Sequence, residues 1–97
     1  MGLFGIFKKK KNVDLEAQRR EHLRQKGRIC DGTIIDSETT AAGGEIVYYV
    51  YSVHGVDFES SELLSEEQLN GDPLKYAPGA KVGVRYDPKN HGNSMLV

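Results

Sequence analysis

The sequence predicts a mainly β fold with minor α content: a small curled antiparallel sheet or partly open barrel of 4–5 strands, with an N-terminal helix and one short helical turn. Three observations lead to this class. The chain has 97 residues, which corresponds to one domain. From residue 28 onward, short runs rich in β-branched and aromatic residues are separated by glycine, proline and asparagine. Only residues 13–27 and residues 61–71 carry helical signals.

The N-terminal part of the chain divides into an apolar-basic arm, residues 1–12, and a helix, residues 13–27. Asn12 can cap the helix, Glu16 lies in its acidic first turn, and Gly27 can end it. The helix has too few apolar residues for a continuous core stripe. We therefore expect a partly solvated helix, which either docks on the rest of the chain or is ordered by a partner.

The β domain, residues 28–97, reads as short strands joined by turns. Its strongest strand is EIVYYVYSVH, residues 45–54, which is β-branched or aromatic at almost every position. Because both faces of this strand are apolar, we expect it to be central and covered on both sides over part of its length. His54-Gly55 then fits a tight hairpin, with the glycine supplying a positive φ. The other expected elements are strand 28–36, loop 37–44, strand 56–61, a helical turn within 61–71 capped by Ser60 or Ser61, strand 80–86, turn 87–93 and closing strand 94–97.

Charge is distributed unevenly along the chain. Residues 1–28 hold nine basic and three acidic side chains, whereas residues 29–97 hold four basic and eleven acidic ones, so net charges of +6 and -7 give the total of -1. A basic arm beside an acidic body is typical of an interaction tail. The alternative is an arm that lies on the body and balances its charge.

The sequence predicts no catalytic, metal or cofactor site. Asp87 precedes a proline and is expected to form a turn, and Cys30 has no second cysteine with which to form a disulfide or redox pair. His22, His54 and His91 are not at metal-ligand spacing. No phosphate loop, nucleophile elbow or dinucleotide fingerprint occurs. We therefore expect a non-enzymatic protein without cofactors.

The N-terminal arm is a candidate for reversible membrane contact. The longest apolar run, Ile46 to Tyr51, has six residues against the ~20 of a helical span, and the start does not have the order of a secretory signal. We therefore expect a cytoplasmic protein, with the arm able to reach the inner face of the membrane. Its apolar side chains would enter the headgroup boundary and its lysines would face anionic lipid; the alternative is a solubilised tail. The membrane-contact candidates are Leu3, Phe4, Ile6, Phe7, Lys8, Lys9, Lys10 and Lys11.

The closing segment GAKVGVRYDPKNHGNSML resembles the end of the domain-of-unknown-function 3592 family. The resemblance rests on a glycine, a Val-x-Val strand, Tyr-Asp-Pro, a turn and a last hydrophobic strand, and the segments GTII and IVYYVYSVHGVDF match earlier parts of the family in order. It covers about residues 28–97 and departs at Asn90-His91, where Asn-Pro is expected. It implies a small, mostly bacterial β domain, often found beside membrane-spanning helices, and it implies no activity.

We expect the protein to be a protein- or peptide-interaction module that pairs with an extended segment through an exposed sheet edge. The partner-surface candidates are Tyr48, Tyr49 and Tyr51. The alternative function is nucleic-acid association through the basic segment 8–28, although the acidic body disfavours phosphate binding. A homodimer joined through an edge strand is a further hypothesis, because so small a core contributes only ~3–5 kcal/mol.

Overall fold

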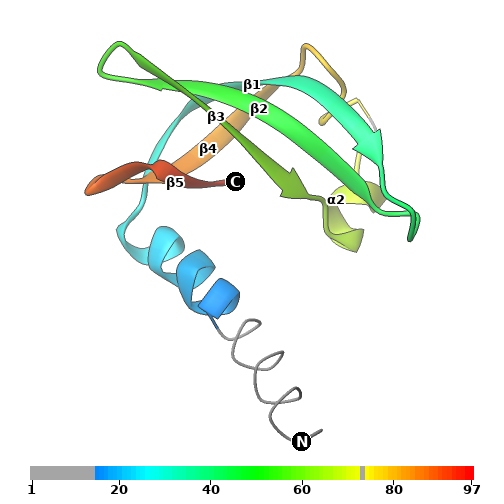
Figure 1. Cartoon of the computed structure of the whole chain (residues 1–97), viewed down its shortest axis with the longest axis horizontal. Coiled ribbons are helices and arrows are strands. Elements are labelled where there is room, and N and C mark those ends of the chain that lie inside the picture. The colour runs from blue at the N-terminus through cyan, green and yellow to red at the C-terminus, as the bar shows by residue number, and fades with distance from the viewer. Residues whose placement is uncertain (1–14, 73) are drawn as a thin grey trace, which may run out of the picture.

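The computed structural model describes residues 15–72 and 74–97 and contains a mainly β fold, as predicted (Figure 1). A helix, described over residues 15–26 and called here the N-terminal helix, precedes the sheet. The elements that follow are β1 (Arg28–Thr39), β2 (Glu45–Val53), β3 (Val56–Leu63), α2 (Glu66–Asn70), β4 (Lys81–Asp87) and β5 (Asn90–Leu96). No helix within the described residues is long and apolar enough to cross a membrane.

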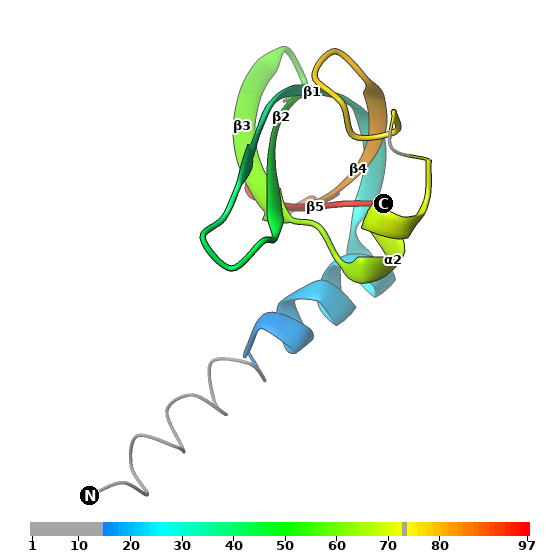
Figure 2. The same cartoon turned by 90° about the vertical axis from the view of Figure 1, so that its right-hand side faces the viewer.

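The five strands form one antiparallel sheet that curls into a nearly closed barrel. The strand order is β3-β2-β1-β4-β5, so β3 and β5 are the two edges of the sheet. Figure 2 shows the curl from its end, with β3 and β5 brought back toward one another. Within residues 15–72 and 74–97, no main-chain ladder joins β3 to β5. We call this unpaired line between β3 and β5 the seam.

The curl depends on β1, which pairs with β2 along one side and with β4 along the other. At Gly32 the neighbouring strands β2 and β4 leave no room for a side chain on β1. A Cβ there would lie 2.6 Å from Val84 Cγ2 and 3.0 Å from the carbonyl oxygen of Val50. The register with β2 shifts between Ile34 and Asp36, which marks a bulge. A bulge increases local twist and bends the strand. Glycine at position 32 and the bulge beyond it therefore allow β1 to bend while it pairs with both β2 and β4.

The core lies inside the barrel and is supplied by alternate residues of each strand. On β2, the fully or nearly buried side chains alternate with half-exposed ones. The expectation that both faces of this strand are covered is therefore wrong, because no second layer lies on the outer face within the described residues. The buried residues of β2 are Val47, Tyr49, Tyr51 and Val53, and the half-exposed ones are Ile46, Tyr48 and Val50.

Two local features differ in how well the sequence predicted them. The hairpin at His54-Gly55 is confirmed: φ is 52° at His54 and 80° at Gly55, and two successive positive values are typical of a type I′ turn. The predicted cap of the helical turn at Ser60 or Ser61 is wrong, since β3 continues through both and Ser65 caps α2. Ser65 and Gln68 form a reciprocal capping box there.

Candidate functional site

Two of the three tyrosines predicted to face a partner are buried in the core, which corrects that prediction. Tyr49 is 0 % exposed and Tyr51 is 3 % exposed. The Tyr49 hydroxyl lies 2.8 Å from Ser94 Oγ, and the Tyr51 hydroxyl donates to the carbonyl oxygen of His91 at 2.5 Å. Both therefore bridge the barrel interior from β2 to β5. Burial raises the pKa of both phenols, which keeps them protonated.

The third tyrosine, Tyr48, lies on the outer face of β2 and is half-exposed. Its hydroxyl donates to the Glu38 carboxylate at 2.6 Å. Tyr48 is thus the one partner-surface candidate that the fold leaves on the surface. The predicted membrane-contact residues, positions 3–11, lie outside the described residues.

Asp87 and Cys30 are residue types that often act in catalysis, but their contacts here fit structural roles. Asp87 accepts the main-chain N–H of Lys89 at 2.8 Å, as expected for a turn, and this bond lowers the pKa of its carboxyl. Burial and the neighbouring Asp31 raise the pKa of the Cys30 thiol, which disfavours the reactive thiolate. In the described part of the chain, no group of three or more His, Cys, Asp or Glu side chains is placed to hold a metal ion.

A buried carboxylate, Glu62, connects the two edges of the sheet at one end of the seam. This side chain of β3 is only 6 % exposed. Its Oε1 accepts the main-chain N–H of Leu96 on β5 at 3.1 Å, and its Oε2 accepts from Gln68 Nε2 on α2 at 3.2 Å. Arg20 of the N-terminal helix places Nη2 3.5 Å from the same Oε1. Three elements therefore meet on one side chain of β3, which the sequence analysis did not single out.

Main-chain groups along the β5 edge are engaged by side chains instead of a neighbouring strand. The carbonyl oxygen of Ser94 accepts from Arg19 Nη1 at 2.9 Å, and the N–H of Leu96 donates to Glu62. The carbonyl oxygen of His91 accepts the Tyr51 hydroxyl. This edge is thus closed by contacts from the N-terminal helix, from β3 and from β2.

The β3 edge is different, because its outward main-chain groups have no such contacts. The N–H of Leu64 donates to the carbonyl oxygen of Glu45 at 2.9 Å, so Leu64 directs its main chain toward β2. In an antiparallel pair this direction alternates along the strand. The intervening residues therefore direct their N–H and C=O groups toward the seam, and no hydrogen bond within the described residues engages these groups. They are Asp57, Glu59, Ser61 and Leu63.

A groove of about 730 Å³ opens at the end of the seam, between the N-terminal helix and α2. We call it the seam groove. We call its apolar lining, which comes from the ends of β3 and β5 and from Val97, the floor, and its charged lining, which carries both signs, the rim. The floor residues are Leu63, Met95, Leu96 and Val97, and the charged rim residues are Arg20, Arg24, Arg85, Glu66 and Glu67. A ligand there would lie beside the free β3 edge.

The comparisons with known proteins concern the β domain. A family model for a domain of unknown function, DUF3592, matches residues 27–97. No curated protein and no solved structure gives a match. The matched segment contains all five strands, α2 and both sides of the seam. The chain therefore belongs to the DUF3592 family, as its closing Tyr-Asp-Pro motif and aromatic β2 strand indicated.

Proposed function

We propose that the protein is a non-enzymatic interaction module that binds an extended peptide segment of a protein partner along the β3 edge. The single observation that carries this proposal is the difference between the two edges: β5 is closed by side chains, whereas β3 has outward main-chain groups without hydrogen bonds among the described residues. An unpaired strand edge is a template for another strand. Addition of a peptide strand to such an edge is a common recognition mode.

The chemistry of the seam groove indicates which peptide would fit. The peptide main chain would pair with Ser61 and Leu63, and an apolar side chain would cover the groove floor. Leu63 is 57 % exposed, so it has apolar surface for a partner to bury. Main-chain bonds would then supply affinity, and the apolar floor would supply specificity. A partner surface formed by Tyr48, Tyr49 and Tyr51 together does not fit the burial of Tyr49 and Tyr51.

Replacing Ser61 with proline is expected to abolish peptide pairing at the edge while preserving the fold. Proline removes the outward N–H of Ser61, and an edge strand tolerates this because the β2 ladder does not use that group. The probe is a peptide selected from a displayed random library against the full chain. By titration calorimetry, Ser61→Pro should weaken its binding by about tenfold or more, as expected for a lost hydrogen bond plus a steric block.

The matched control is Ser61→Ala, which removes the hydroxyl but keeps the N–H. It should bind the selected peptide as the unchanged chain does. Equal losses in both variants would assign the effect to the side chain and contradict edge pairing. Failure to select any peptide would also count against the proposal, as would a peptide whose NMR shift changes avoid β3.

We further propose that the module works in the bacterial cytoplasm and reversibly contacts the inner face of the membrane through the arm. Support comes from the sequence, where Leu3, Phe4, Ile6 and Phe7 precede Lys8–Lys11. We expect the full chain to sediment with vesicles of anionic lipid and not with neutral ones. The matched control replaces the four lysines by glutamine in the full chain and should stay in the supernatant. Equal sedimentation of both chains would contradict the electrostatic contact.

Nucleic-acid association through segment 8–28 is the less favoured function, for a structural reason. Three arginines of this segment already have acidic partners: Arg19 and Arg20 contact Glu16, Arg20 also contacts Glu62, and Arg24 contacts Glu21. Nucleic-acid binding needs Lys and Arg side chains that are available to neutralise phosphates. Pairing of these arginines reduces the basic charge that the N-terminal helix offers.

A further inference from the structure

The N-terminal helix is attached to the barrel by few side-chain contacts, and most of these lie at the seam. One further contact joins His22 Nε2 to Asp87 Oδ2 at 3.4 Å, at the turn between β4 and β5. Leu23 is its one fully buried side chain among residues 15–26. Arg19 Nη1 donates to Asn93 Oδ1 at 3.0 Å and to the carbonyl oxygen of Ser94 at 2.9 Å. Most of the other helix residues are exposed. A helix held in this way opens locally at a lower cost than the core strands do.

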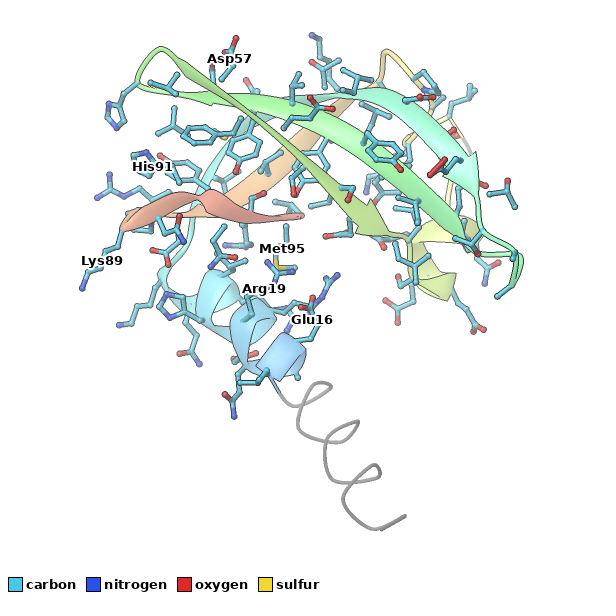
Figure 3. All side chains as sticks on the ribbon, in the orientation of Figure 1. Glu16, Arg19, Asp57, Lys89, His91 and Met95 are labelled. Carbon is cyan, nitrogen blue, oxygen red and sulfur yellow. The ribbon has the colours of Figure 1, made fainter. Side chains whose placement is uncertain are left out.

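Burial along β5 shows what the helix covers. Ser94, Met95 and Leu96 are consecutive and all buried, although successive side chains of a strand point to opposite faces. Ser94 and Leu96 face the barrel interior, where Ser94 meets Tyr49 and Leu96 belongs to the core. Met95 therefore faces outward, and Figure 3 shows it between β5 and the N-terminal helix, close to Arg19. The helix thus holds the outer side of β5.

We propose that the N-terminal helix is a latch that keeps β5 on the seam, and that its release opens the β3 edge to a partner strand. This inference rests on the proposed function, since it concerns regulation of the same edge. The need for a latch follows from the geometry: β5 lies close enough to β3 for the Glu62 carboxylate to reach the N–H of Leu96. A strand pairs at about 4.8 Å from its neighbour. The nearby β5 therefore restricts the space that a partner strand would need in order to pair with β3.

Release of the helix weakens the closed seam through two groups. The carbonyl oxygen of Ser94 loses Arg19, and the Glu62 carboxylate loses Arg20. A buried carboxylate without a cationic partner favours access to water. Opening of the seam gives Glu62 this access and frees the main chain of β3. Helix docking and peptide binding are then linked, and each must weaken the other by the same factor.

The test uses full-length variants outside the lining of the seam groove, so that peptide contacts stay unchanged. Arg19→Ala removes the contacts of the latch with Asn93 and Ser94, and Leu23→Ala removes its buried anchor. Gln18→Ala is the matched control, because Gln18 is an exposed residue of the same helix. The readouts are amide hydrogen exchange at Leu96, which needs no partner, and affinity for the library-selected peptide.

We expect exchange at Leu96 and affinity for the peptide both to rise by about tenfold in Arg19→Ala, within the usual range of coupling between sites. Leu23→Ala should raise both further, and Gln18→Ala should change neither. Should Leu23→Ala fail to fold, Arg19→Ala carries the test. The selected peptide should also speed amide exchange in residues 15–26 of the unchanged chain.

Unchanged exchange at Leu96 in both latch variants would overturn the proposal, whatever the peptide does. Faster exchange with unchanged peptide affinity would also overturn it, because the seam would open without controlling the β3 edge. Should no peptide bind any variant, the proposed function falls. Faster exchange at Leu96 would then still support the latch on the seam itself.

Discussion

Replacing Tyr49 with alanine is expected to lower the free energy of unfolding by about 3–5 kcal/mol, the range for truncating a large buried aromatic side chain. Among the described residues, Tyr49 is the largest fully buried side chain, and it lies against Tyr51 with ring centroids 5.9 Å apart. A small domain has only about 5–15 kcal/mol of total stability. Much of the variant should therefore be unfolded well below the melting temperature of the unchanged chain, as measured by thermal and urea unfolding.

Tyr49→Phe separates the ring from the hydroxyl. It keeps the packing but removes the contact with Ser94 Oγ, so the expected loss is about 1 kcal/mol. Tyr48→Ala is the surface control: its side chain lies on the outer face, and its truncation should cost less than that of Tyr49. A loss for Tyr48→Ala as large as that for Tyr49→Ala would contradict the assignment of inner and outer faces.

Tyr49→Phe also changes how the free energy of unfolding depends on alkaline pH. Burial raises the pKa of Tyr49 above its ordinary value of 10.0, so the folded state holds this proton more tightly than the unfolded state does. The resulting stability is fully present below pH 10 and is lost as pH rises through the folded pKa. Tyr51 shifts in the same direction. Tyr49→Phe should therefore lose less stability than the unchanged chain between neutral pH and pH values above 10, measured by urea unfolding.

Replacing Glu62 with alanine is expected to destabilise the protein by about 3 kcal/mol, the lower end of the range for breaking a buried ion pair, because Arg20 remains partly exposed. The variant leaves the N–H of Leu96 without its acceptor and removes the partner of Gln68. For a domain of this size, each kcal/mol corresponds to about 4–8 °C in melting temperature. Thermal unfolding followed by circular dichroism measures the effect.

Two further substitutions, one at Glu62 and one at the exposed Glu67, separate the effect of the charge from the effect of burial. Glu62→Gln keeps an acceptor for Leu96 and removes the charge, so its loss should be smaller than that of Glu62→Ala. Glu67→Ala removes an exposed carboxylate from the first turn of α2 and should cost only a few tenths of a kcal/mol. If Glu62→Ala were no more destabilising than Glu67→Ala, Glu62 would not be the connection across the seam.

Local sequence by itself determined the elements of this protein. A run of β-branched and aromatic residues makes β2 a strand in almost any context. His54-Gly55 accepts the two positive φ values that a two-residue hairpin requires. Asp87 forms its turn with the N–H of Lys89, two residues away. These choices need only neighbouring residues, so the sequence predicted the fold class and most of the elements.

Only the tertiary structure decided which residues form the candidate site. Since both faces of β2 are apolar, no pattern in the sequence could place Tyr49 inside and Tyr48 outside; that depends on the direction in which the sheet curls. Glu62 stands in the acidic, serine-rich segment FESSEL, which reads as solvent-exposed. It is buried because its partners arrive from distant parts of the chain, the N–H of Leu96 from 34 residues later and Arg20 from the N-terminal helix. The seam exists because the curl of the sheet brings its two edge strands together without a ladder between them.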